Sequence, residues 1–212
     1  TVLALAGQHP SEHCGSLAVR GIVDFLLSAH PEARAIRRCC DLWAVPMINV
    51  DGNVHGRNGW TVQDVNPFTD FSGASGGQAP VAVEDRLLWD WAAELEPHLC
   101  LNFHGYMGTR AFAEHPYDGC YVLKDPCAVY GPGRVELYRK VEHVLLWDTP
   151  ALSATSDPGE LDQSTLEWQL ARRCGTVPAF YEINHGFAGV EGSRRRGADV
   201  FRAVLCAALG GA

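Results

Sequence analysis

Two residues near the beginning of the chain have the types and spacing needed to share one metal ion. His9 and Glu12 are three positions apart in the run His9-Pro10-Ser11-Glu12. On a turn that enters a helix, side chains at positions i and i+3 project toward the same side. Zinc used for hydrolysis binds such sets of two imidazoles and one carboxylate and leaves its fourth position to water. His104, far along the chain, is the candidate for the second imidazole.

Each of these residues also has an ordinary structural explanation. With nine histidines in an acidic chain, a His-x-x-Glu pair can arise by chance. Taken alone, His9 fits a loop or capping histidine, and Glu12 fits a first-turn acid that the helix dipole favours. His104 fits a hydrogen-bonded core histidine. Whether the three residues bind a metal or have ordinary structural roles therefore depends on the strands and helices that position them.

The chain alternates between apolar runs and segments with helical spacing. Short apolar runs predict buried strands at residues 2–6, 42–50, 98–103, 121–123 and 177–181. Apolar residues at helical spacing predict helices at residues 16–27, 83–95, 134–146, 161–173 and 200–209. This alternation indicates one α/β domain, with a mixed, largely parallel twisted sheet and helices on both faces.

The candidate residues fall at equivalent places in this expected fold. In open α/β sheets the ligand site forms outside the carboxyl ends of the strands. His9, His104 and Glu182 are each expected just past a strand, so they can converge despite their wide separation in the sequence. The long polar stretch between the second strand and residue 82 carries Arg57 and Asn66. A loop of that length usually lines a functional site or is disordered.

Composition restricts the classes of partner. The chain has 212 residues, 47% of them hydrophobic, and a formal net charge of −8. This charge disfavours a nucleic-acid or anionic-membrane partner, and the single dense basic run, 194–196, is interpreted as a solvated helix start. No segment approaches the ~18 to 20 uninterrupted apolar residues that cross a bilayer, so no membrane span is predicted.

The cysteines and the first residues bear on the compartment. The eight cysteines form no C-x-x-C pair. They therefore fit small buried hydrophobes in a reducing interior, and we expect a cytoplasmic protein. Thr1 opens directly into an apolar run, so we expect that the natural start lies further upstream, where a signal peptide stays an open alternative.

Five short motifs follow one another along the chain. They are QHPSE at 8–12, VPMINVDG at 45–52, DVN at 64–66, NFHG at 102–105 and FYE at 180–182. In this order they resemble the M14 zinc carboxypeptidases, and the first two are most similar to the cytosolic-carboxypeptidase-like branch. Each motif is common alone, whereas five in the right order at strand ends are specific. The resemblance runs from His9 to Glu182.

The resemblance implies a set of roles. His9, Glu12 and His104 would bind one Zn²⁺ ion, and Glu182 would act as general base and acid. Zinc lowers the pKa of a bound water toward ~7, and a nearby carboxylate can accept its proton and return it to the leaving amine. This chemistry agrees with the residue types found at these positions.

The resemblance also implies two substrate-facing residues and shows one departure. Arg57 matches an arginine that polarises the scissile carbonyl, and Asn66 matches an asparagine that helps to receive the terminal carboxylate of the substrate. Next to Asn66 the family has an arginine that clamps this carboxylate, but here the residue is Pro67, which has neither charge nor donor. The bidentate clamp that the resemblance implies for an exopeptidase is therefore missing at this position.

Two further features of the family are missing. Its mobile tyrosine has no counterpart between residues 151 and 180, and His185, Tyr106 and Arg110 are the candidate replacements. The chain begins at the strand that carries the metal motif, so we expect residues 1–212 to be a catalytic domain that lacks its N-terminal part.

The resulting hypothesis is a zinc metallocarboxypeptidase that acts on the C-terminus of a peptide or protein, with neither nucleic acid nor membrane as partner and with the oligomeric state left open. One alternative is a deacylase of N-acyl amino acids similar to aspartoacylase and succinylglutamate desuccinylase. A second alternative is a catalytically inactive binding module on the same fold.

Overall fold

The computed structural model describes residues 1–106, 118–148 and 158–210 and contains one six-stranded sheet. The strand order is β2-β1-β3-β6-β4-β5, and every neighbouring pair is parallel except β4 with β6. The strands are β1 (Val2–Ala6), β2 (Leu42–Val45), β3 (Leu99–Tyr106), β4 (Gly119–Leu123), β5 (Gly159–Leu161) and β6 (Val177–Asn184). The expected mixed, largely parallel sheet is confirmed.

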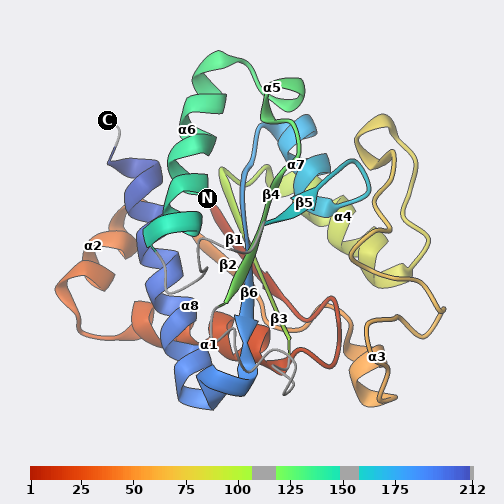
Figure 1. Cartoon of the computed structure of the whole chain (residues 1–212), viewed down its shortest axis with the longest axis horizontal. Helices are drawn as coiled ribbons and strands as arrows, with labels where there is room; N and C mark the ends of the chain where they lie inside the picture. The colour runs from red at the N-terminus through yellow and green to blue at the C-terminus, as the bar shows by residue number, and fades with distance from the viewer. Residues whose placement is uncertain (107–117, 149–157, 211–212) are drawn as a thin grey trace.

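Helices cover both faces of this sheet (Figure 1). The longer ones are α1 (His13–Leu27), α2 (Pro31–Cys39), α4 (Val83–Leu95), α6 (Pro132–His143), α7 (Leu166–Cys174) and α8 (His185–Leu209). The short ones are α3 (Val50–Val54), η1 (Ala74–Gly76), α5 (Pro126–Val129) and the π-helical η3 (Val144–Asp148). Among the described residues, none of the helices has both the length and the apolar character needed to span a bilayer.

Strand β1 shows why two helix layers are needed. Val2, Ala4 and Ala6 pack into the core cluster that includes α1, α6 and α8, whereas Leu3 and Leu5 pack into the cluster that includes α4 and α7. Side chains alternate between the faces of a strand, so a fully apolar strand requires cover on both sides. This explains why the sequence of β1 is a continuous apolar run rather than an alternating one.

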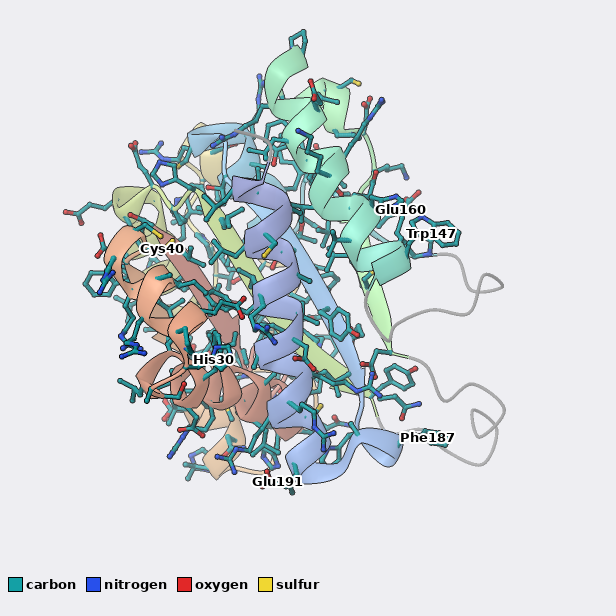
Figure 2. The ribbon with its side chains drawn as sticks, turned by 90° about the vertical axis from the view of Figure 1, so that its left-hand side faces the viewer. His30, Cys40, Trp147, Glu160, Phe187 and Glu191 are labelled. Carbon is teal, nitrogen blue, oxygen red and sulfur yellow. The ribbon has the colours of Figure 1, made fainter. Side chains whose placement is uncertain are left out.

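Helices α1 and α8 pack with their backbones in direct contact, and α8 runs along this face beside α1, α2 and α6 (Figure 2). A Cβ atom on Gly21 would lie 1.9 Å from the carbonyl oxygen of Arg194, and one on Gly197 would lie 2.1 Å from that of Ala18. Any side chain at either glycine would force the helices apart. The two glycines therefore bring the final helix against the helix that follows the metal motif.

Several expected elements differ from the structure. The predicted strand 42–50 ends at Val45, and residues 50–54 form α3 because the Asn49 side chain caps that helix by accepting from the Gly52 N–H at 2.9 Å. The predicted helix 161–173 is split into β5 and α7, and Thr165 caps α7. Pro31, expected to end a helix, also begins α2, where its fixed φ and missing N–H suit the first turn.

The basic run at 194–196 lies inside α8 and is not a solvated helix start. Arg194 pairs with Asp24 of α1 at 2.5 Å, and Arg196 pairs with the buried Asp118 beside β4. Two of the three arginines therefore tie α8 to neighbouring parts of the fold.

Candidate metal centre

Three side chains meet at the carboxyl end of the sheet. His9 and Glu12 come from the turn between β1 and α1, and His104 comes from β3. Glu12 Oε1 lies 2.9 Å from His9 Nδ1, and Glu12 Oε2 lies 2.9 Å from His104 Nδ1. One ligand atom from each residue lies within 4.8 Å of the other two, so the group could hold a metal ion.

The outer nitrogens of both imidazoles are already occupied. His9 Nε2 lies 3.2 Å from Asn66 Oδ1, and His104 Nε2 lies 3.0 Å from Gln8 Oε1. Because an amide oxygen only accepts, each Nε2 carries a proton and donates it to the amide. The Nδ1 atoms of both imidazoles face the carboxylate of Glu12.

A cation placed between Glu12 and the two Nδ1 atoms would contact all three groups at once. His104 Nδ1 is buried and has no hydrogen-bond partner among the described residues, although it lies 2.9 Å from Glu12 Oε2. Two imidazole nitrogens and one carboxylate, with amide oxygens behind the imidazoles, match the donors and the outer contacts of hydrolytic zinc sites. The residues present therefore fit one zinc ion.

Glu12 is held in its ionised form. Burial opposes this charge, but the contacts with His104 and His9 outweigh burial and lower the pKa of Glu12 to about 2. Its Oε2 also accepts from the Gly105 N–H at 3.1 Å. The carboxylate is thus fixed in place and charged over the whole neutral range.

Glu182 lies beside His104 in the pairing of β6 with β3. Aligned residues of paired strands project from the same face of the sheet, so its carboxyl is directed to the side of the metal group. Burial raises the pKa of Glu182 to about 7; nearby His104 opposes the rise, and Glu12 adds to it. A carboxyl group with this pKa can both accept and return a proton near neutral pH.

Both His104 and Glu182 lie inside strands, although the sequence predicts them just past strand ends. Strands β3 and β6 continue to pair with each other through these residues to Tyr106 and Asn184. The periodicity of apolar residues could not reveal this, because most residues at these strand ends are not apolar, while the backbone pairing of the two strands continues.

A cavity of about 610 Å³ opens next to Glu12. Tyr106 and His185, two of the candidate replacements for the missing tyrosine, line it together with Asn58. His185 Nδ1 is buried and has no hydrogen-bond partner among the residues that the structure describes. The third candidate, Arg110, lies outside the described residues.

The structure places Arg57 and Asn66 differently with respect to the metal group. Asn66 Oδ1 faces His9 Nε2 and also accepts from the Phe68 N–H at 3.0 Å. Arg57 pairs with Asp64 at 2.7 Å, and both side chains are exposed. Asn66 therefore contacts His9, one of the proposed metal ligands, whereas Arg57 is held by Asp64 at the exposed surface of the loop.

Sequence reasoning gave no role to three residues around His104, although each lies in one of the five motifs. Phe180 stacks on its ring with centroids 4.5 Å apart, and Gln8 and Asn102 form a buried amide pair beneath it. Asn102 could have been noticed as an amide inside the apolar run 98–103. Buried amides need partners, so this position indicates a polar network in the core.

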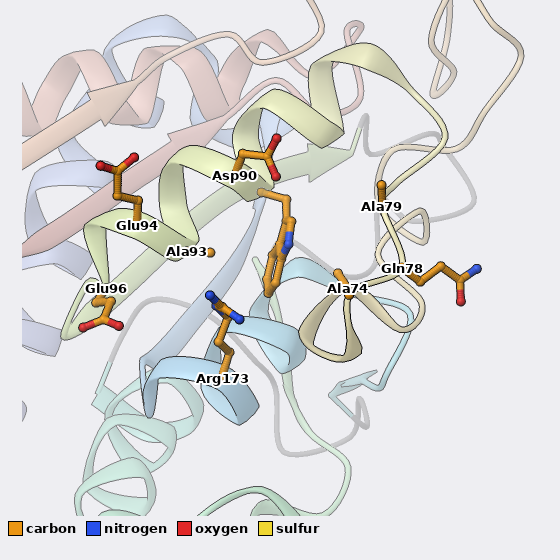
Figure 3. A pocket seen from close by; sticks show the side chains of 10 residues that line it. Ala74, Gln78, Ala79, Asp90, Ala93, Glu94, Glu96 and Arg173 are labelled. Carbon is orange, nitrogen blue, oxygen red and sulfur yellow. The ribbon is translucent and has the colours of Figure 1, made fainter.

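A second cavity, of about 580 Å³, lies between α4 and α7 (Figure 3). Its lining includes Asp90, Glu94 and Glu96, and Arg173 lies 6.0 Å from the ring of Trp89. None of the three residues of the metal group lines it. We therefore place the chemistry at the cavity beside Glu12.

Comparison with known proteins agrees with this site. The family model described as zinc carboxypeptidase (Peptidase_M14) matches residues 1–127. Cytosolic carboxypeptidase 6 of Mus musculus is 42% identical over 52 residues, which are 24% of this chain and 10% of that protein.

Solved structures share the fold over nearly the whole chain. A metallo-carboxypeptidase from Burkholderia cenocepacia has a TM-score of 0.80 at 18% identity, over 100% of this chain and 57% of that one. A metallo-carboxypeptidase from Pseudomonas aeruginosa has a TM-score of 0.73 at 19% identity, over 99% and 56%. The chain thus spans a tenth of the curated relative and little more than half of each solved structure. Since the family model covers more than half of the 212 residues, the chain belongs to the M14 zinc carboxypeptidase family.

Proposed function

We propose that residues 1–212 act as the catalytic domain of a metallocarboxypeptidase that removes a C-terminal residue from a peptide or protein. The observation that carries this proposal is the meeting of His9, Glu12 and His104, with Glu182 aligned beside His104. Membership of the family and the cavity next to Glu12 support it.

The proposed chemistry divides between the metal and the chain. When bound by His9, Glu12 and His104, one zinc ion would supply Lewis-acid activation of a water and of the scissile carbonyl. Glu182 accepts the proton of the attacking water and later donates it to the leaving amine, a role open to a carboxyl group aligned beside His104. Arg57 stabilises the developing oxyanion from the loop.

The terminal carboxylate of the substrate would be bound without a bidentate arginine at position 67, because Pro67 follows Asn66. Asn66, Tyr106 and His185 are the proposed contacts for the terminal carboxylate, and the last two line the cavity. The net charge of −8 supports neither a nucleic-acid nor a membrane partner. The cytosolic relative and the eight free cysteines support a cytoplasmic location.

Metal analysis of the 212-residue chain tests the site. Wild type should bind one zinc ion, and His104→Ala should bind far more weakly because one of three ligands is lost. His143→Ala is the matched control, since His143 is exposed at the end of α6. Equal zinc content in wild type and His104→Ala would contradict the proposed centre.

A substrate panel tests the reaction. We expect hydrolysis of peptides with a free C-terminus and little hydrolysis of the same peptides with an amidated C-terminus. Preferential cleavage of N-acyl amino acids would replace the proposal with the deacylase alternative. Zinc-loaded protein that cleaves neither class would indicate the inactive binding module.

A further inference from the structure

A buried series of hydrogen-bonded side chains connects His104 to Glu167 of helix α7. His104 Nε2 donates to Gln8 Oε1 at 3.0 Å, and Asn102 Nδ2 donates to Gln8 Oε1 and to Glu167 Oε1, both at 2.6 Å. These four side chains are at most 1% exposed. This series of hydrogen bonds therefore joins His104, a proposed metal ligand, to the carboxyl group of Glu167, which has no access to solvent.

The orientation of both amides follows from one backbone carbonyl. Gln8 Nε2 donates to the carbonyl oxygen of Pro67 at 3.0 Å, and this oxygen can only accept. Gln8 Oε1 must then face His104 and Asn102. His104 consequently carries its proton on Nε2, and Asn102 presents its amide hydrogens to Gln8 and Glu167.

Two polar atoms in this series have no hydrogen-bond partner among the described residues, Asn102 Oδ1 and Glu167 Oε2. They belong to the same two side chains that already share the 2.6 Å hydrogen bond. A proton on Glu167 Oε2 would supply a donor on the side chain that Asn102 already contacts, and an acid and an amide can pair through a ring of two hydrogen bonds. An ionised Glu167 would instead leave two buried acceptors without a donor, which is costly.

We propose that Glu167 is a positioning residue, kept as a neutral carboxylic acid, which together with the Pro67 carbonyl holds Asn102 and Gln8 so that His104 presents Nδ1 to the metal. Its effect on zinc rests on the proposed metal centre, whereas its protonation does not. Burial raises the pKa of Glu167, and the contacts with Asn102 and its own backbone N–H only partly offset this. The first turn of α7 favours a charge, but complete burial of Glu167 opposes it.

Infrared spectroscopy of protein labelled with ¹³C-glutamate tests the protonation directly. The comparison is made at pH ~8, above the pKa of about 7 of Glu182, so that most other glutamates are ionised. Wild type should show a protonated carboxyl band that is absent in Glu167→Gln and retained in Glu160→Gln, which changes an exposed glutamate. If Glu167→Gln removes no such band, Glu167 is ionised, for instance with a water bridging the two oxygens, and the proposal is wrong.

Zinc binding and the tautomer of His104 test the positioning role. Glu167→Gln should keep the zinc affinity, because a glutamine amide can donate to Asn102 Oδ1 and accept from Asn102 Nδ2. Glu167→Leu should lower the affinity by at most the roughly 10- to 100-fold that loss of a direct outer-shell partner costs, because Glu167 acts on His104 through Asn102 and Gln8. ¹⁵N-histidine spectra should show His104 protonated on Nε2 in wild type and Glu167→Gln, with a second tautomer in Glu167→Leu.

The outcomes separate this proposal from the proposed function. Equal loss of zinc affinity in Glu167→Gln and Glu167→Leu would show that the charge is required and would overturn the inference. If wild type binds no zinc, the proposed function fails, while the infrared and tautomer measurements still decide the state of Glu167. If Glu167→Leu does not fold, Glu167→Gln and the infrared band remain decisive.

Discussion

His104 and Glu182 are aligned partners in the parallel pairing of β3 with β6, so a proposed metal ligand and the proposed base stand side by side on the same face of the sheet. Neighbouring strands are about 4.8 Å apart, which brings the two side chains within reach of one reacting group. On its other side Glu182 is aligned with Gly119, where a Cβ atom would lie 3.2 Å from the Glu182 Cβ. The glycine leaves room for the carboxyl group.

The raised pKa of Glu182 predicts how the stability of the metal-free protein depends on pH. A carboxyl group with a folded pKa of about 7 contributes stability while protonated, and this contribution is lost as pH rises from the ordinary glutamate range toward 7. Compared with Glu182→Gln, wild type should lose at most about 1.4 kcal/mol of unfolding free energy per pH unit, and less because the group is partly exposed. Urea unfolding of both proteins at several pH values measures this difference.

Zinc loading should weaken the trend, because a nearby dication favours the carboxylate and lowers its pKa. In the loaded protein, Glu182→Gln should lower kcat by about 10²- to 10⁴-fold while zinc affinity stays the same. For the metal-free proteins, the same dependence of unfolding free energy on pH in wild type and Glu182→Gln would contradict the raised pKa of Glu182.

Asn66 has two proposed roles, support of His9 and contact with the terminal carboxylate of the substrate. Its Oδ1 contacts His9 Nε2, so Asn66→Ala should weaken zinc binding by about 10- to 100-fold, as loss of an outer-shell partner does. Asn66→Asp keeps an acceptor at this position and should retain zinc. Zinc titration and steady-state kinetics separate the roles: a raised KM with unchanged zinc affinity would show that Asn66 acts on the substrate alone.

Arg57 should matter for catalysis and little for folding. Its ion pair with Asp64 is exposed, so Arg57→Ala should change the unfolding free energy by less than about 1 kcal/mol. If the guanidinium faces the developing oxyanion, kcat/KM should fall by about 10²- to 10³-fold. Arg86→Ala, at an exposed position of α4, is the control and should change neither quantity. Unchanged kcat/KM in Arg57→Ala would remove Arg57 from the proposed site.

Arg196 should matter for folding. It pairs with Asp118, a buried residue that also accepts from the Tyr181 hydroxyl and the Asn184 N–H, both at 2.9 Å. Arg196→Ala leaves this carboxylate without its cation and should cost about 3 to 5 kcal/mol. Arg195→Ala, at an exposed position one residue earlier, should stay within about 0.5 kcal/mol of wild type.

Chemical denaturation measures both variants, and a double variant gives a further check. Adding Asp118→Asn to Arg196→Ala removes the unpaired charge and should recover part of the lost stability. If Arg196→Ala and Arg195→Ala are equally stable, the buried ion pair contributes nothing.

Local sequence patterns predicted much of the architecture. The strand over residues 2–6 and the helix over 83–95 lie where the apolar spacing places them. The strand expected over 42–50 is shorter because Asn49 starts a helix, a hydrogen bond that apolar periodicity does not report. The predicted helix start at residue 161 fails for a similar reason, since Leu161 pairs with β4 and only Thr165 caps α7.

The sequence by itself determined the kinds of groups available, two imidazoles and two carboxylates expected near strand ends, because residue type and short-range spacing are local properties. Only the tertiary structure decided that His104 and Glu182 are aligned and that Asn66 supports His9. It also decided that a buried chain from Pro67 to Glu167 orients His104. Such contacts depend on strand register and on the direction of single amides, which are set when segments far apart in the chain pack together.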